Sequence, residues 1–331
     1  MTIEELQGLL FQSVRSRIAK DDNLVDQVAR VLNISTDSAY RRIRGDKALS
    51  LEEAGMLCKN FHLSLDSLMQ LQPDSFRFTG SFVQPSAFDF GQWLKLVLQQ
   101  VKYMSGFRER EMFYLCKDIP IFHHFHYREL AAFKHYVWMK GISNDPAFLH
   151  RKFRIADYPD EYFELGRKAL SLYNEIDSVE IWNLESINST MRQVDFYHEC
   201  GLFAEVEEVV RIYEALEKLL VHLDRQAGSG AKYMAGDEQP GARFRMYFNE
   251  IVIGDNSVLG VLDGSMVGFI VHTVFNVMTT TDLGFTANMH ESMQNLMKKS
   301  TLISSVSERE RARFFKYLRR RIAHRKERIN A

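Results

Sequence analysis

The stretch that decides the fold of the first part of the chain is LVDQVARVLNISTDSAYRRIRG, residues 24–45. It predicts two short helices, 24–32 and 36–44, joined by a tight turn. Apolar residues recur three and four positions apart in the first helix, as on a buried helix face. Asn33 tolerates the left-handed conformation that ends a helix sharply, and Ser35 can cap the next helix with its hydroxyl. The stretch therefore predicts a helix-turn-helix.

The outer face of the second helix carries hydrogen-bonding and positively charged side chains. Ala39 and Ile43 face inward, and Gly45 is a natural stop for the helix. Arginine and lysine are concentrated in this helix and its exit, which is what a helix that docks into a DNA groove needs. The candidate DNA-binding residues are Ser35, Thr36, Asp37, Tyr40, Arg41, Arg42, Arg44 and Lys47.

This arrangement resembles the helix-turn-helix of lambda-repressor-like (XRE-type) DNA-binding domains. The matching residues are Ala29 where the helices touch, Asn33 where glycine is usual, Ile34 after the turn, and Arg44-Gly45 at the end. The resemblance continues through a helix at 50–59, where Ser50 and Glu53 are spaced as a capping box, and through the segment 64–69. It implies a five-helix domain over residues 1–70 that binds double-stranded DNA with helix 36–44 in the major groove.

We assign roles within that helix from the chemistry of DNA readout. Arg41 and Arg44 are expected at guanine edges, because a guanidinium can bond O6 and N7 together. Arg42, which we place at the edge of the exposed face, and Lys47 are expected to hold the phosphate backbone. The remaining polar residues, Thr36, Asp37 and Tyr40, would contact neighbouring bases or phosphates.

A segment in the middle of the chain, taken together with the helix-turn-helix, indicates a second resemblance that covers the full length. The segment KDIPIFHHFHYRELAAFKHY at 117–136, together with ISTDSAYRRIRG at 34–45, is similar to a family of Bacteroidota-type helix-turn-helix regulators. These regulators carry a long C-terminal region of no assigned function. The resemblance brings no known ligand, so a small-molecule or peptide effector is left open.

Composition points to a globular protein in the cytoplasm. The 331 residues are 46% hydrophobic and 26% charged, and the three cysteines are widely spaced, as in reducing compartments. The N-terminus has no basic region of a signal peptide, and the apolar stretch 258–278 is interrupted, so no membrane contact is expected. The net charge is −1, and residues 1–79 hold 10 basic against 11 acidic side chains. This balance argues against indiscriminate DNA binding.

Residues 71–86 are expected to form a linker, and 87–331 a regulatory and dimerisation region. Helical spacing recurs at 93–104, 126–140, 158–176, 184–199, 203–223 and 285–297. Strands are expected only in a small antiparallel β-meander at 244–277, where Asp263-Gly264 is a strong hairpin signal. The predicted fold class is therefore mainly α. The terminal segment 308–328 predicts a basic helix packed by Phe315, Leu318 and Ile322, or a helix for dimerisation or phosphate contact.

The only cluster that could carry chemistry is formed by His123, His124 and His126, with Asp118, Glu129 and His135 nearby. His123 and His126 are weak candidates for metal ligands, because two imidazoles and a carboxylate suit a transition metal. Histidines of this kind are more often hydrogen-bonded core or surface residues. No catalytic or phosphate-loop motif is present, so neither enzymatic activity nor a cofactor is expected.

The sequence predicts a sequence-specific DNA-binding transcription regulator that acts as a homodimer. The alternative is a helical protein-interaction or peptide-sensing module without direct DNA readout, with a concave aromatic groove among the helices of 90–225. A metal-dependent enzyme is a third reading that depends on the histidine cluster alone. The sequence leaves open the operator, the effector, the sign of regulation, and whether 87–225 and 244–331 form one domain or two.

Overall fold

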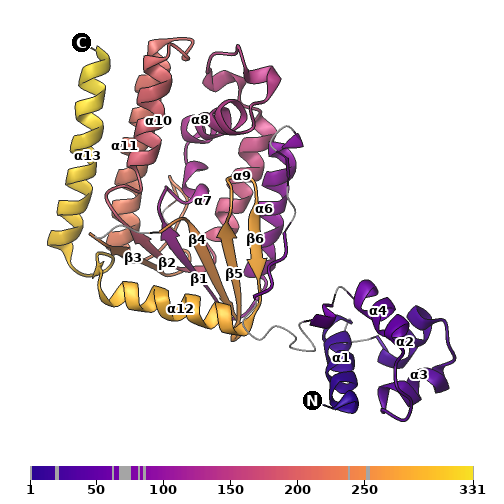
Figure 1. The fold of residues 1–331 in the computed structure, drawn as a ribbon. Helices are drawn as coiled ribbons and strands as arrows, with labels where there is room; N and C mark the ends of the chain where they lie inside the picture. Colours follow the sequence, from indigo (N-terminus) through magenta and orange to yellow (C-terminus); the bar gives the residue numbers. More distant parts are fainter. Residues whose placement is uncertain are drawn as a thin grey trace. The chain divides into compact units, whose positions relative to one another are not determined.

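The computed structural model describes residues 2–18, 22–61, 63–66, 76–80, 83–84, 87–237, 239–250 and 254–330. The chain forms two compact units, Met1–Arg77 and Phe78–Ala331 (Figure 1). None of the helices within the described ranges is both long and apolar enough to span a lipid bilayer.

The boundary between the units falls inside the segment 71–86 that we expect as a linker. Thr79 exchanges two backbone hydrogen bonds with Thr279, of 2.7 and 2.8 Å. The backbone N–H of Val83 donates to Asn276 Oδ1 at 2.7 Å. The described residues from Phe78 onward therefore belong to the second unit.

The first unit is helical and has its own apolar core. Its helices are α1 (Ile3–Arg17), α2 (Leu24–Leu32), α3 (Thr36–Ile43) and α4 (Leu51–Asn60). The core is formed by side chains from all four, among them Val14, Val28 and Leu57, which are fully buried. Of the expected fifth helix at 64–69, residues 65 and 66 are helical and 67–69 lie outside the described residues.

The second unit is mixed α/β, and the prediction of a mainly α region with a small meander is wrong. A seven-stranded sheet runs through it in the order β6-β5-β4-β1-β2-β3-β7. The strands are β1 (Arg110–Cys116), β2 (Asp177–Trp182), β3 (Phe244–Phe248), β4 (Ser257–Leu262), β5 (Ser265–Val271), β6 (Val277–Thr280) and β7 (Thr301–Leu302).

The sheet combines a parallel centre with antiparallel edges. Strand β2 pairs in parallel with β1 and with β3, whereas β4 is antiparallel to β1 and begins the meander β4-β5-β6. The expected meander at 244–277 is therefore divided, because β3 joins β2 and not β4. The hairpin expected at Asp263-Gly264 is confirmed: it joins β4 to β5, with φ angles of 45° and 81°.

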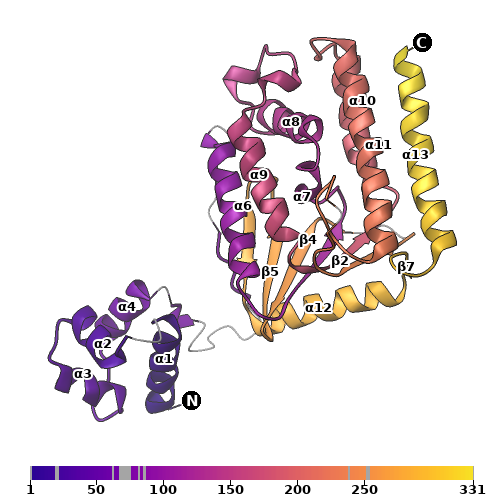
Figure 2. The same cartoon turned by 180° about the vertical axis from the view of Figure 1, so that it is seen from behind.

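Helices cover both faces of the sheet. One face carries α6 (Phe90–Ser105), α7 (Ile121–His124), α8 (Arg128–Val137), α9 (Asp160–Tyr173), α10 (Asn188–Glu199), α11 (Val206–Ser229) and α13 (Glu308–Asn330). Helix α12 (Leu283–Lys298) lies on the opposite face, as both views show (Figures 1 and 2). Successive side chains of a strand point to opposite faces of the sheet and so pack in different layers. Met112 and Tyr114 point to the large helical layer, and Phe113 points to α12.

Short helical segments fill the connection from α8 to α9. A π-helical turn, η2 (Trp138–Ile142), continues α8, and the 3₁₀ turns η3 (Pro146–Phe148) and η4 (Ile155–Asp157) follow it. Helix α11 ends at Gly230, whose φ of 70° is the left-handed conformation that glycine adopts readily. The long loop after it returns the chain to β3.

The terminal helix α13 packs as its apolar stripe predicts. Phe315, Leu318 and Ile322 are fully buried. Much of its positive charge is paired with acids of the second unit: Arg311 and Arg319 with Asp224, Arg321 with Glu185, Arg325 with Asp195, and Lys326 with Glu217. These pairs favour a structural role for α13 over a role in binding phosphate.

Candidate nucleic-acid interface

The turn between α2 and α3 has the geometry that the sequence predicts. Asn33 adopts the left-handed conformation, with φ 54° and ψ 49°. The backbone N–H of Ile34 then donates to the carbonyl of Ala29 at 3.0 Å. Ser35 caps α3, because its hydroxyl accepts the backbone N–H of Ser38 at 3.2 Å. The turn therefore fixes where α3 begins and how it leaves α2.

The inner face of α3 is anchored by Ala39 and by Arg42. Ala39 is fully buried and Arg42 is 4% exposed. The Arg42 guanidinium donates to both carboxylate oxygens of Glu53, at 3.1 and 2.5 Å, and to the carbonyl of Ser38 at 3.0 Å. This arrangement differs from the sequence analysis, which places Arg42 at the edge of the exposed face as a backbone contact. Within α3 its side chain faces the core side and joins α3 to α4.

Glu53 accepts the hydrogen bonds of Arg42 and also forms part of the N-terminal cap of α4. Its carboxylate accepts the backbone N–H of Ser50 at 3.1 Å, and the hydroxyl of Ser50 accepts the N–H of Glu53 at 3.1 Å. The hydrogen bonds from Arg42 lower the pKa of Glu53 below its usual value, against the opposing effect of burial. The capping box expected from Ser50 and Glu53 is confirmed, and it has a second function in holding Arg42.

The outer face of α3 is open to solvent in the first unit. Tyr40 is 49% exposed, and the side chain of Arg44 is 60% exposed. The Arg44 guanidinium lies 5.7 Å from the centre of the Tyr40 ring and 3.7 Å from a carboxylate oxygen of Asp46. The exposed members of the predicted set are Ser35, Thr36, Asp37, Tyr40, Arg41, Arg44 and Lys47. The face thus presents three cations and three hydroxyl-bearing residues close to the helix, with Asp37 as its acid.

Gln7 positions the exit of α3, and the sequence did not predict this role. Its amide nitrogen donates to the carbonyls of Arg42 and Lys47, at 2.6 and 2.9 Å, and its amide oxygen accepts the N–H of Leu49 at 3.0 Å. Gln7 is 6% exposed. Its place between apolar residues of an amphipathic helix is the signal that could have identified it, because a buried polar side chain needs partners.

The histidines of the predicted cluster make hydrogen bonds with different partners. His123 Nε2 donates to Glu180 Oε1 at 2.8 Å, and His126 Nδ1 accepts the backbone N–H of Ala235 at 3.3 Å. The His123 and His126 rings are stacked with centres 6.0 Å apart. Burial lowers the pKa of His124 to about 3, so that imidazole is neutral. No group of three or more histidine, cysteine, aspartate or glutamate side chains within the described ranges is arranged to hold a metal ion.

Glu180 is the centre of a buried polar network in the second unit. Its carboxylate accepts hydrogen bonds from His123, from the Tyr173 hydroxyl at 2.5 Å and from the Trp182 indole at 2.7 Å. Burial would raise its pKa, but these donors lower it. Lys232 lies on the same Tyr173 ring, 3.6 Å from its centre, and burial lowers the pKa of Lys232 to about 7. The network is closed to solvent, since Glu180 and Lys232 are fully buried.

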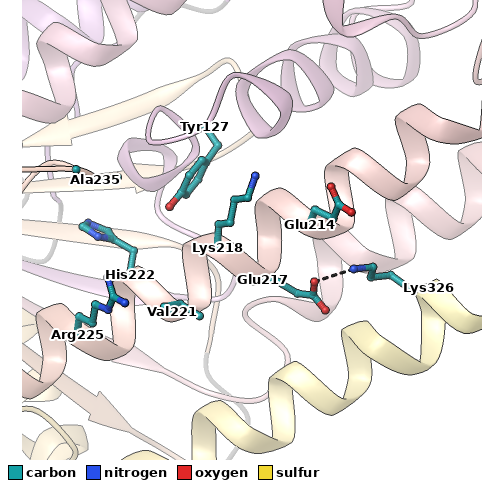
Figure 3. Close-up of a pocket in the computed structure, with 10 residues that line it drawn as sticks. Tyr127, Glu214, Glu217, Lys218, Val221, His222, Arg225, Ala235 and Lys326 are labelled. Carbon is teal, nitrogen blue, oxygen red and sulfur yellow. Dashed lines mark hydrogen bonds and ion pairs between the residues drawn. The ribbon is translucent and has the colours of Figure 1, made fainter.

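A groove of about 460 Å³ lies along α11 in the second unit. Figure 3 shows Glu214, Lys218 and Arg225 on this face of α11, with Tyr127 opposite. Glu217 on the same helix pairs with Lys326 of α13 at 2.8 Å (Figure 3). Half of the lining residues are charged, and Tyr127 and His222 are its ring-bearing side chains.

No family model, no curated protein and no solved structure matches the chain.

Proposed function

We propose that this protein is a sequence-specific DNA-binding transcription regulator, and that α3 enters the major groove. The observation that carries the proposal is the division of α3 into two faces. Ala39 and Arg42 hold one face to the rest of the first unit, while Tyr40, Arg41 and Arg44 are exposed on the other. A short helix held at both ends and presenting guanidinium groups is suited to base readout in the major groove.

The residues that we propose as DNA contacts differ from those predicted from the sequence at one position, Arg42. Arg41 and Arg44 remain the candidates for guanine edges, and Lys47 for a phosphate. Arg42 is excluded from the set, because its guanidinium is used by Glu53 and Ser38. Ser35 contributes by capping α3, and its exposed side chain is also at the helix end where phosphates are commonly held.

The regulator is proposed to act as a homodimer in the cytoplasm. An eight-residue helix reaches few base pairs, and proteins of this docking type commonly bind two half-sites about one helical turn apart. Dimerisation also doubles the phosphate contacts without making one protomer strongly basic. Light scattering at micromolar concentration tests this part, and a monomeric mass with and without the selected DNA contradicts it.

The test of the function is selection from random-sequence DNA with the purified full chain, repeated at two salt concentrations. We expect enrichment of a two-fold symmetric site. Arg41→Ala should then lower the affinity for that site by about 1–3 kcal/mol, roughly 5- to 150-fold, and relax one base position. Lys59→Ala is the matched control, because Lys59 is an exposed cation on α4.

The alternative function is an interaction module without DNA readout. The near-balanced charge of the first unit favours it, since residues 1–79 hold 10 basic and 11 acidic side chains. The same selection separates the two proposals. An absence of enrichment at either salt concentration, together with equal affinities of the Arg41→Ala and Lys59→Ala proteins for DNA, would contradict DNA readout by α3.

A further inference from the structure

The meander half of the sheet presents a continuous apolar row to the helical layer. The strand register places Tyr114 of β1 beside Val258, Val258 beside Phe269, and Phe269 beside Thr279. These side chains share one face of the sheet, because neighbours across a ladder point to the same side. Val258, Phe269 and Thr279 are only half-buried. The row is therefore incompletely covered by the helices above it.

A cavity of about 500 Å³ lies over this row. Helix α6 packs on α9, and Trp93 and Val97 of α6 form a wall of the cavity together with Trp138 of the π-helical turn. The two indole rings are 4.9 Å apart between centres and meet edge to face. Both the volume and the mainly apolar lining are those of small-molecule sites, which are clefts of about 300–1,000 Å³ with a few polar groups.

One end of the cavity holds an ion pair. Lys134 of α8 donates to Asp118 Oδ2, and both residues line the cavity. The other oxygen of Asp118 accepts the N–H of Ile119 at 2.8 Å and the hydroxyl of Thr190 at 3.4 Å. An ammonium has three protons to donate, and the described residues provide an acceptor for one of those on Lys134. The pair therefore has spare capacity to donate, through the remaining protons of Lys134.

We propose that this cavity binds an uncharged amphiphile whose apolar body covers the row on β4–β6 and whose carbonyl oxygen accepts a hydrogen bond from Lys134. The proposal is independent of DNA binding by the first unit. It assigns to the second unit a site for a small molecule, and it selects one class of ligand by charge.

The charge of the site excludes the two ionised versions of such a ligand. Lys134 lowers the pKa of Asp118 despite the effect of burial, so the pair contributes one charge of each sign and is neutral. A ligand carboxylate would lie beside the Asp118 carboxylate, and a ligand ammonium beside Lys134. Either would leave a charge without a counter-charge in a poorly solvated site, which is unfavourable. A carbonyl dipole avoids this cost.

The first test uses the full chain and the straight-chain amides hexanamide, octanamide and decanamide. Binding is followed by tryptophan fluorescence, since Trp93 and Trp138 line the cavity, and by calorimetry. Each added methylene should tighten binding by about fourfold, the fold-change for one buried CH₂. A series with no dependence on chain length would overturn the proposal, and this test needs no variant that has to fold.

The second test uses matched variants and matched head groups. Val97→Phe, which fills the cavity, should abolish decanamide binding, whereas Val221→Phe in the charged groove of α11 should leave it unchanged. Decanamide should bind at least tenfold more tightly than decanoate or decylammonium at pH 7. Equal binding to the two variants would overturn the site, and tighter binding of either ion than of the amide would overturn the assigned ligand class.

Discussion

Replacing Arg42 by methionine should destabilise the first unit and leave the proposed DNA contacts in place. The change removes three hydrogen bonds, two to Glu53 and one to the carbonyl of Ser38. The side chains of Arg42 and Glu53 are 5% and 20% exposed. Breaking a buried pair costs about 3–5 kcal/mol, whereas an exposed pair contributes at most about 1 kcal/mol.

The expected loss lies between these limits. Glu53 keeps its bond from the Ser50 N–H and has some access to water, so its carboxylate is not left fully uncompensated. We expect the free energy of unfolding of the first unit to fall by about 2–3 kcal/mol. For a domain of this size the melting temperature should fall by about 10–20 °C.

Hydrogen exchange with peptide resolution measures the effect in the full chain. Amides in α2, α3 and α4 should exchange about 30- to 150-fold faster in the Arg42→Met protein, and those of the second unit should not change. Lys59→Met, an exposed site on α4, is the control. The reasoning would be refuted by unchanged exchange combined with an equal loss of affinity for all DNA sequences and a smaller salt dependence. That result would make Arg42 a phosphate contact in solution.

Three further predictions concern stability, two for the second unit and one for the first. Burial lowers the pKa of three histidines of the second unit to between about 3 and 4: His124, His135 and His222. As the pH falls below 6.5, these histidines therefore take up protons in the unfolded chain before they do so in the folded protein. Each should cost about 2 kcal/mol of stability between pH 6.5 and 5, and a tryptophan-detected unfolding midpoint that is constant over this range would contradict the effect. Gly166→Ala should destabilise the unit by at least about 1–3 kcal/mol, because the new Cβ would lie 2.1 Å from Cδ1 of the buried Phe125 ring. At Gly55 in α4 an added Cβ has no neighbour, so Gly55→Ala should raise the thermal stability of the first unit slightly. If Gly166→Ala and Gly55→Ala lowered stability alike, the contact with Phe125 would not be the cause.

The parts of the fold that the sequence predicts are those determined by neighbouring residues. Asn33 in the left-handed conformation, the Ser35 cap and the capping box of Ser50 with Glu53 each depend on residues within a few positions of one another. The same is true of the Asp263-Gly264 hairpin. In each of these cases the residues that determine the cap or the turn lie close together in the sequence, so the pattern alone identifies the structure.

The centre of the sheet could not be predicted in this way. Strand β2 reads DSVEIW and holds Glu180 at a fully buried position. An acid in the middle of a short apolar run argues against a buried strand, because an ionised carboxylate is costly to bury alone. Of the donors that make it acceptable, Trp182 lies in β2 itself and Tyr173 ends α9 just before it, whereas His123 comes from a distant segment of the chain. Parallel pairing with β1 likewise joins segments some 65 residues apart.

Of the residues predicted to contact DNA, Arg42 is the one that the structure buries, and the reason is its position. Arg42 follows Ala39 by three residues, so it shares the inner face of α3, as the helical period requires. The predicted contact with the DNA backbone follows from the charge of Arg42 and not from its position in the helix. An arginine on an inner face needs an acid, and Glu53 was already identified as part of a capping box that could supply one. Helical position together with an available acid therefore distinguishes Arg42 from Arg41, and the same rule leaves Arg41, Arg44 and Lys47 as the cations that DNA would meet.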